Sequence, residues 1–474
     1  MAESGCVLAI DQGTSSTKAL VVAPDGSVLS SAESIVQPRQ VAGGGVEQDP
    51  GELYDSVVQA GRRALVEAAT QVMAVGLANQ GETVLAWDRQ RGDPLTTALS
   101  WQDRRSAGIC DRLAPHSERL RLLTGLPLDP YFAAPKLLWL RENLTRSGVA
   151  TTTDTWLIHR LTGSYVTDVT TASRTGLLDL DRREWSTEAC ELFGVTTQEL
   201  PEIVSCTTTV GTTEMFGGQL PVTGLAVDQQ AALFGEGCLG LGDAKCTYGT
   251  GAFLLANTGD RPIRSTHGLS ASVAWDTAGE VAYCLDGQLY TVGAMVDWLI
   301  RLGLLRDADD LDRLGASVPD AGGVIVVPAL AGLGAPYWQP NTRASIEGLC
   351  LGTTSAHLVR AALEGIAASV ALLVRATARD LGAPIGTLRV DGGLTRSRLL
   401  MQLQADLLQT PVEVFASPHA TALGVAALAR LGCGAAGTPA VLAGQRYEPA
   451  IDADEAAARL AATEAAIARV IGST

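Results

Sequence analysis

The chain has 474 residues, which is too long for one ordinary hydrophobic core and predicts two large domains with a ligand groove between them. It carries 35 basic and 51 acidic residues, a formal net charge of −16, and this excess of acid disfavours nucleic acids and anionic membranes as partners. The nine cysteines are scattered singly without a CxxC pair, so neither a disulfide framework nor a zinc site is indicated.

No basic stretch followed by an apolar stretch opens the chain, and the most apolar predicted helix, residues 357–380, contains Arg360, Glu364 and Arg375. We therefore expect a cytoplasmic protein without a membrane span.

The first motif, residues 8–22, is a pair of apolar runs joined by a polar turn, which predicts two paired strands. The turn contains Thr14, Ser15 and Ser16, whose hydroxyls and N–H groups can bind an anion, and Lys18 can add a positive charge. Asp11, at the end of the first strand, is placed to hold a cation or its water shell. The combination suggests a nucleotide with its magnesium ion, although an ordinary hairpin fits the segment equally well.

The next elements have the order of a known half-domain. A third strand is predicted over 28–36, a loop at 43–45, a helix from the Asp49-Pro50 cap to about Ala69, and an apolar strand over 72–77. This β-β-β-α-β order is that of the first half of an actin-like or ribonuclease-H-like α/β domain, in which phosphate-binding hairpins face a cleft.

Two candidate substrate residues follow predicted strand ends, where ligands are often bound. Glu82 can accept hydrogen bonds from a substrate hydroxyl, and Trp101 can pack on a carbon skeleton. Alternatively, Glu82 caps a turn and Trp101 belongs to the core. Helices are predicted to end near Asn143 and at Gly163; His159, on the second of these, is assigned no chemistry.

Asp228 comes directly after a buried strand and at the start of a helix, where it can act as a general base or simply cap the helix. The glycine-rich segment 235–242 that follows is a plausible hinge. We place the domain boundary there, giving domains 1–236 and 237–474.

The second half repeats the opening motif. Residues 245–257 again form a strand, a Gly/Thr turn and a strand, which predicts a second phosphate-type hairpin. Residues 389–397 are a strand leading into a diglycine turn, where an adenine or its ribose can approach the backbone closely. Two such hairpins half a chain apart are much stronger evidence for nucleotide binding than either alone.

With these segments in view, the sequence resembles the FGGY carbohydrate kinases, and within them the glycerol kinases. The matches run in order over essentially the whole chain: residues 9–14 (AIDQGT), 79–80 with 82–83 (NQ and ET), 101–102 with 104–105 (WQ and RR), 129–132 (DPYF), 154–158 (DTWLI), 172–175 (ASRT), 228–234 (DQQAALF), 247–251 (TYGTG), 332–338 (GLGAPYW), 344–349 (ASIEGL), 357–364 (HLVRAALE) and 390–393 (VDGG).

The resemblance implies two actin-like domains with ATP and Mg²⁺ in the cleft between them. Asp228 would deprotonate the attacking hydroxyl, with Asp11 near the metal. The remaining roles it implies are phosphate binding by Thr14, Ser15, Ser16, Lys18 and Thr250, lining of the nucleotide side by Gly293, Asp297, Gly393 and Ser397, and binding of the polyol by Glu82, Trp101, Tyr131, Asp228, Gln229 and Phe253.

The sequence departs from the glycerol kinase pattern at several positions. Gly81 stands where glycerol kinases have an arginine that donates to glycerol, which would leave space for a longer polyol. Asp297 replaces a glutamine and Lys18 an arginine, and both replacements look tolerable. The loop that binds fructose bisphosphate in some bacterial glycerol kinases is not visible in residues 214–219.

These observations favour ATP-dependent phosphorylation of a terminal hydroxyl of a small polyol, with glycerol the leading substrate. The alternative within the class is a kinase for erythritol, threitol, xylitol or xylulose. ATP-hydrolysing chaperones and filament proteins share the architecture but need no polyol pocket, and a non-catalytic sugar sensor would not need Asp11 and Asp228. A homo-oligomer is left open.

Overall fold

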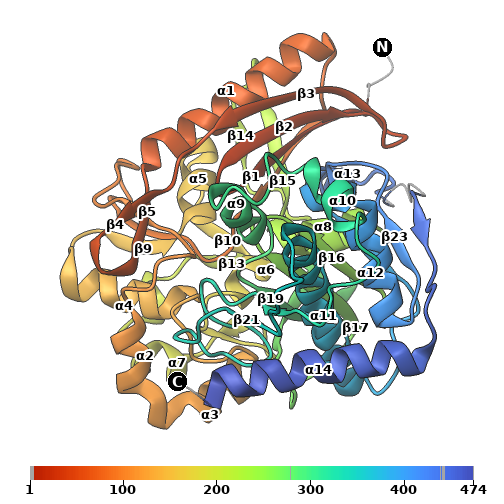
Figure 1. Cartoon of the computed structure of the whole chain (residues 1–474). Helices are drawn as coiled ribbons and strands as arrows, with labels where there is room; N and C mark the ends of the chain where they lie inside the picture. Colours follow the sequence, from red (N-terminus) through yellow and green to blue (C-terminus); the bar gives the residue numbers. More distant parts are fainter. Residues whose placement is uncertain (1–4, 278, 438, 440–443, 473–474) are drawn as a thin grey trace.

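Two large β-sheets, one built from each half of the chain, form the frame of the computed structural model (Figure 1). The structure describes residues 5–277, 279–437, 439 and 444–472. Helices cover the sheets, so the fold is mixed α/β, as the sequence predicts.

The first sheet has six strands in the order β14-β15-β6-β1-β2-β3. β1 pairs antiparallel with β2 and parallel with β6, and β15 runs parallel to β6. Its strands are β1 (Val7–Gln12), β2 (Ser16–Val22), β3 (Val28–Ile35), β6 (Ala74–Asn79), β14 (Thr212–Thr213) and β15 (Leu220–Val227). The predicted opening hairpin and third strand are confirmed, while the strand expected over 72–77 begins two residues later.

The second sheet has seven strands in the order β18-β19-β17-β16-β22-β23-β24. β16 pairs antiparallel with β17 and parallel with β22, which repeats the arrangement of β1, β2 and β6. Its strands are β16 (Ala244–Tyr248), β17 (Ala252–Gly259), β18 (Ser270–Asp276), β19 (Val281–Leu289), β22 (Leu388–Asp391), β23 (Val412–Val414) and β24 (Arg446–Tyr447). The two predicted hairpins are therefore equivalent elements of one topology used twice.

The continuous apolar runs of these strands arise because the first sheet is covered on both faces. In β1, Val7 and Ala9 belong to one hydrophobic cluster, and Leu8 and Ile10 belong to another on the opposite face. α1 (Pro50–Ala68), capped by Asp49 as predicted, packs against β2 and β3. The other face is covered by α13 (Ala420–Gly432), a helix from the second half of the chain.

A close crossing of two helices joins the halves. α8 (Asp228–Gly235) follows β15 and packs against α13. At the crossing, a Cβ added to Gly424 would lie 1.8 Å from the Ala231 carbonyl oxygen, so only glycine fits there.

The longest helix, α11 (Ser355–Leu381), packs against the second sheet together with α12 (Arg398–Leu408). By length and composition α11 could cross a membrane, but 78% of its most apolar window is buried inside the protein, as in the core helix of a globular domain.

A smaller five-stranded sheet, in the order β4-β5-β8-β7-β9, extends the first half. Its strands are β4 (Arg39–Val41), β5 (Gly45–Gln48), β7 (Val84–Trp87), β8 (Ala98–Leu99) and β9 (Val149–Thr152). The loop predicted at 43–45 thus lies at the tip of a hairpin. Further elements are α2 (Ala107–Leu113), α3 (Ser117–Thr124), α4 (Ala133–Asn143), α5 (Thr153–Thr162), β10 (Val166–Asp168), α6 (Val169–Ser173), β11 (Leu178–Asp179), β12 (Glu184–Trp185), α7 (Thr187–Leu192), β13 (Glu202–Val204), α9 (Gly293–Arg301), α10 (Asp310–Gly315), β20 (Ile325–Val327), β21 (Ser345–Glu347) and α14 (Ala453–Gly472).

Candidate active site

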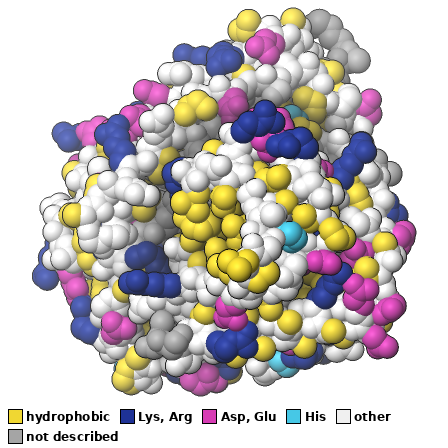
Figure 2. All heavy atoms as spheres, in the orientation of Figure 1, with side chains coloured by type: hydrophobic (Ala, Val, Ile, Leu, Met, Phe, Trp, Pro, Cys, Tyr) yellow, Lys and Arg dark blue, Asp and Glu magenta, His cyan; other side chains and the backbone are white. Residues whose placement is uncertain are grey.

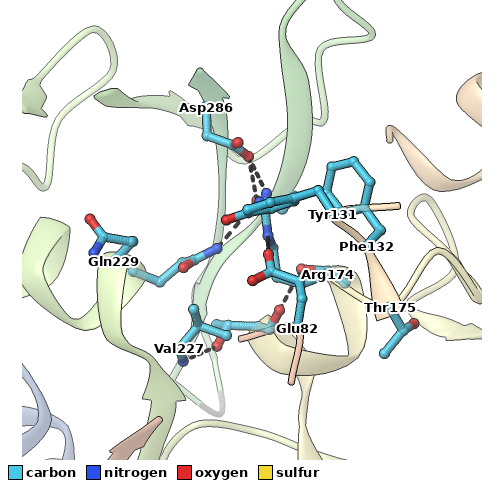
Figure 3. Close-up of polar contacts among 12 residues, drawn as sticks. Glu82, Tyr131, Phe132, Arg174, Thr175, Val227, Gln229 and Asp286 are labelled. Atoms are coloured by element: carbon cyan, nitrogen blue, oxygen red, sulfur yellow. Dashed lines mark hydrogen bonds and ion pairs between the residues drawn. The ribbon is translucent and has the colours of Figure 1, made fainter. Parts of the chain in front are cut away.

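A small pocket lies where the two halves meet, beyond the end of β15. Its cavity measures only about 20 Å³ at the centres of water-sized spheres, room for about one water molecule. Its lining combines residues from both halves: Glu82, Tyr131, Arg174, Val227, Asp228, Gln229, Gln230, Phe253, Leu255, Asp286 and Gly287. Figure 3 shows several of these side chains converging from different elements.

Aromatic rings form one wall of this region. The ring of Trp101 meets Tyr131 and Phe253 edge to face, with centroids 5.7 and 5.9 Å apart. Trp101 Nε1 also donates to Thr14 Oγ1 at 2.8 Å, which ties this wall to the first hairpin turn. Trp101 is therefore a contact between the halves and is not enclosed in a domain core.

A buried lysine holds the loop that carries Tyr131. Lys136 Nζ donates to the carbonyl oxygens of Pro130, Tyr131 and Phe132, with distances of 3.0 and 2.8 Å to the first and last. Burial lowers the pKa of Lys136 to about 7. The lysine fixes three consecutive carbonyls and so orients the Tyr131 ring.

Glu82 is buried against an arginine that the sequence analysis did not select. Arg174 Nε donates to Glu82 Oε1 at 2.7 Å, and Nη1 donates to Asp286 Oδ2 in β19 (Figure 3). Burial raises the pKa of Glu82 despite Arg174. The carboxylate contacts a charged partner from α6's end and is not a turn cap.

Asp228 is the first residue of α8, and its Oδ1 accepts a 2.7 Å hydrogen bond from the Gln229 backbone N–H. Burial, together with the charges of Asp11 and Glu82, raises the pKa of Asp228 to about 7. A carboxylate with this pKa can accept a proton at neutral pH. The residue that precedes it, Val227, occupies the helix cap position, so capping does not account for Asp228.

Gln229 is held by another buried cation. Lys245 Nζ, from β16, donates to Gln229 Oε1 at 2.5 Å and to Thr247 Oγ1 at 2.8 Å. The lysine fixes the amide orientation, since the amide oxygen accepts from Lys245 and the amide nitrogen is thereby the donor end.

The charge of Asp391, from the second half, acts on Asp11, from the first, where the hairpins converge. Asp11 lies opposite Lys18 in the β1–β2 register, and burial raises its pKa to about 6, with Asp391 adding to the rise. Asp391, at the end of β22, has a buried Oδ1 with no hydrogen-bond partner among the described residues. A divalent cation held by these carboxylates would favour the ionised form of Asp11 and give Asp391 Oδ1 a partner. Mg²⁺ commonly takes one or two carboxylates plus phosphates and water. The donor set therefore fits magnesium, although no cluster of three or more ligating side chains occurs among the described residues.

The first hairpin turn is exposed at its tip. Ser15 is exposed, and Thr14 and Ser16 are half-buried. The Gly13 N–H donates to the Ser16 carbonyl at 3.0 Å and closes the turn.

The second hairpin turn meets the start of α9. Thr250 is exposed, and its carbonyl accepts from the Val292 and Ala294 N–H groups at 2.9 and 3.2 Å. Gly293 donates to the Gly249 carbonyl at 3.0 Å, and Asp297 is exposed one helical turn later. Gly293 thus packs directly on the turn.

The structure places the last two predicted nucleotide residues on either side of one short turn. Gly393 is exposed after β22. Ser397 is buried, and its Oγ caps α12 by accepting from the Leu400 N–H at 3.1 Å and also contacts Asp312. The hydroxyl of Ser397 is therefore committed within the protein.

The space expected at Gly81 is filled. A Cβ at this position would lie 3.1 Å from Val227 Cγ1 and 3.8 Å from Arg174 Cγ. The expectation of room for a longer polyol at this point is wrong, because these two side chains occupy it.

Sequence reasoning missed Arg174, Lys245, Asp286 and Asp391 as members of the site. Asp391 carried a usable signal, since a carboxylate between an apolar strand and a diglycine turn mirrors Asp11. The other three lie within apolar strands or after a short helix, and only the fold brings them to the cleft.

Comparison with known proteins gives a consistent result. The N-terminal domain model of the FGGY family of carbohydrate kinases matches residues 6–235, and the C-terminal domain model matches residues 244–433. A glycerol kinase of Aromatoleum aromaticum is 43% identical over 489 residues, covering 98% of this chain and 99% of that protein. A glycerol kinase of Thermus brockianus is 44% identical over 446 residues, covering 90% of each.

Among solved structures, Plasmodium falciparum glycerol kinase with ADP matches with a TM-score of 0.91 and 32% identity, covering 98% of both chains. Xylulose kinase from Rhodospirillum rubrum matches with a TM-score of 0.87 and 23% identity, covering 98% of this chain and 99% of that chain. At this identity the match shows a shared fold only.

Proposed function

The chain belongs to the FGGY family of carbohydrate kinases, and on that premise we propose that it phosphorylates glycerol at a terminal hydroxyl with ATP, giving glycerol 3-phosphate. The observation that carries the proposal is Asp228, a carboxylate with a pKa raised to about 7 that lines the pocket between the two halves together with Glu82, Gln229 and Phe253.

In this proposal Asp228 accepts the proton of the attacking hydroxyl while Glu82 and the Gln229 amide hold the other hydroxyls. Trp101, Tyr131 and Phe253 pack on the carbon chain. Phosphoryl transfer requires in-line positioning and charge stabilisation, with little covalent chemistry from the protein. The side chains named here supply positioning and a base.

The two hairpins are proposed to hold the nucleotide. Phosphate oxygens would be bound by Thr14, Ser15, Ser16, Lys18 and Thr250, and the remainder of the nucleotide would lie along Gly293, Asp297, Gly393 and the segment capped by Ser397. Asp11, with Asp391, would hold Mg²⁺, which when bound supplies charge screening between the phosphates. We assign these functions to domains 1–236 and 237–474 of a cytoplasmic enzyme.

A longer acceptor is a second candidate because of a neighbouring cavity. A cavity of about 490 Å³ shares Tyr131 with the small pocket and is also lined by Trp101, Gln102 and Arg104. It has room for the distal carbons of a pentitol.

The test is a coupled ADP-release assay with MgATP across glycerol, erythritol, threitol, xylitol and xylulose. Glycerol is expected to give the highest kcat/KM. If xylitol or xylulose is preferred by tenfold or more, the second candidate replaces the first, and if no acceptor stimulates ADP release the kinase assignment to this pocket fails.

Asp228→Asn is the matched variant, because it keeps the shape of the side chain and removes its basicity. We expect loss of acceptor phosphorylation by at least 10²-fold with nucleotide binding unchanged. Turnover close to the unmodified enzyme would remove Asp228 from the role of base.

A further inference from the structure

The acceptor pocket has an unusual balance of charge. Three carboxylates, Glu82, Asp228 and Asp286, line it, and Arg174 is the one cationic side chain among the described residues that line it. A polyol hydroxyl both donates and accepts hydrogen bonds, so carboxylates satisfy only its hydrogen. The oxygen lone pairs of the acceptor need donors, and a guanidinium is the strongest donor available here.

Arg174 is held rigidly with part of its guanidinium uncommitted. Nε is occupied by Glu82 at 2.7 Å and Nη1 by Asp286. No hydrogen bond among the described residues uses Nη2. The guanidinium carbon lies 5.2 Å from the Phe132 ring centroid and 5.8 Å from that of Tyr131, so aromatic rings also limit its movement. Figure 3 shows Arg174 between Glu82 and Asp286, beside these two rings.

The side chain runs along the bare backbone of Gly81. A Cβ at position 81 would lie in ordinary contact with Arg174 Cγ, at 3.8 Å, and close against Val227 Cγ1, at 3.1 Å, so a side chain that extends beyond Cβ would compete with both. Gly81 and Arg174 therefore form a matched pair, in which the glycine leaves room for the arginine to reach the pocket from a different segment of the chain.

We propose that Arg174 is a substrate-binding residue that donates from Nη2 to an acceptor hydroxyl other than the reacting one, and that it determines which acceptors the enzyme selects. The inference rests on the proposed function. Since Arg174 comes from the first half and Asp286 from the second, the donor reaches its position only when the halves are together.

The competing explanation is that Arg174 only stabilises the fold. Removing one member of a buried ion pair leaves the other charges uncompensated and destabilises a protein whatever its substrate. A test must therefore measure something that general destabilisation does not change, namely discrimination between acceptors that differ by one hydroxyl.

Arg174→Lys is the main variant. It keeps the positive charge between Glu82 and Asp286, so the fold is retained. It removes the planar guanidinium that can donate to Glu82, Asp286 and the acceptor hydroxyl at the same time. The acceptors are glycerol, 1,2-propanediol and 1,3-propanediol, of which each diol lacks one hydroxyl of glycerol. kcat/KM is measured for each acceptor, together with the KM for ATP.

We expect Arg174→Lys to lower kcat/KM for glycerol by about 10- to 150-fold, the range for a hydrogen bond to a charged group. The loss should be several-fold smaller for the diol that lacks the contacted hydroxyl, with the KM for ATP unchanged. Equal losses for all three acceptors, or no loss for any, would overturn the proposal.

Two further variants keep the test decisive. Gly81→Val leaves every charge in place and extends beyond the Cβ position, which is already in van der Waals contact with Arg174 Cγ at 3.8 Å, so it should show the same acceptor-selective loss in a milder form. Uniform behaviour toward the three acceptors counts against the proposal. Arg183→Gln is the matched control, because Arg183 Nη1 joins the same two halves through Tyr283 Oη at 2.9 Å and lies outside the pocket lining. It should not alter discrimination.

Failure of the proposed function is recognised separately. If the unmodified enzyme phosphorylates none of the three acceptors, then the function is wrong. If it phosphorylates glycerol but Arg174→Lys does not change selectivity, the function stands and the inference about Arg174 falls.

Discussion

At the scale of single residues, burial controls the chemistry of this site. Asp228 and Asp11 both have carboxyl pKa values raised by desolvation, to about 7 and about 6. The charges of Asp11 and Glu82 add to the rise at Asp228, and the charge of Asp391 adds to the rise at Asp11. Groups of like charge concentrated in a cleft are costly for folding, and they are the arrangement expected where a proton acceptor and a cation site are needed.

The pKa of Asp228 predicts the pH dependence of activity. A base must be deprotonated, so kcat/KM for the acceptor should fall about tenfold per pH unit below pH 7 and level off above pH 8. A pH profile of initial rates with saturating MgATP checks this. A profile that stays flat down to pH 5 would contradict the raised pKa of Asp228.

The same shift predicts an effect on stability. The folded protein holds a proton on Asp228 between about pH 4, the unfolded value, and about pH 7, so this residue's contribution to the free energy of unfolding falls as pH rises through that range. Asp228→Asn removes this pH dependence. Measured against the unmodified protein, the variant should gain up to about 4 kcal/mol more free energy of unfolding at pH 8 than at pH 4. Urea unfolding at both pH values measures it; the conservative Asp55→Asn on the surface of α1 serves as the control.

Lys136 predicts a coupled loss of stability and acceptor binding. Lys136→Met retains the length of the side chain but leaves the carbonyls of residues 130–132 without their donor. We expect a loss of about 2–4 kcal/mol and a raised KM for the acceptor, because Tyr131 is no longer held. Denaturant titration and acceptor kinetics check both; Glu142→Gln, at an exposed position of the same helix α4, is the control.

At the scale of elements, the crossing of α8 and α13 positions the base. Asp228 begins α8, and the helix can approach α13 closely because Gly424 and Gly235 have no side chains at the contact. The same helices lie against the first sheet, so the position of the carboxylate depends on packing that involves both ends of the chain.

Gly424→Ala should therefore be strongly destabilising, although alanine favours helices. The new Cβ would lie 1.8 Å from a backbone oxygen, and neither helix can shift without moving the base. We expect a loss of about 3 kcal/mol or more, together with reduced kcat. The control is Gly472→Ala in α14, where a Cβ meets no atom within 4 Å. Similar melting temperatures for both variants would contradict the role of Gly424 in this crossing.

At the scale of the whole molecule, the two halves are not independent in space. α13, from the second half, covers one face of the first sheet, and one hydrophobic cluster contains residues of both. On the face shown in Figure 2, acidic and basic side chains are interspersed, with no broad basic surface.

A fragment of residues 1–236 should accordingly fail to fold cooperatively, because it lacks the helix that covers β1, β6 and β15. We expect it to bind a hydrophobic dye and to lack a sharp thermal transition. The control fragment joins residues 1–236 to 415–437 through a flexible linker and should regain the transition. Cooperative unfolding of the shorter fragment would show that α13 is dispensable for the first sheet.

The sequence by itself determined those features that depend on residues close together in the chain. Apolar runs, hydroxyl-rich turns and helix caps identified both hairpins, the opening strands, α1 and the place of Asp228, because these depend on neighbouring residues. Ordered motif matches indicated the family.

Only the tertiary structure decided which distant groups meet in the cleft. Lys245 and Asp286 stand in no motif, and the motif at 172–175 does not show what Arg174 does. The charges of all three become significant only where folding buries them beside partners 16 to more than 100 residues away. Gly81 shows the same limit: the sequence reveals a missing side chain, while the space it leaves is bordered by Val227 and Arg174 from other parts of the chain.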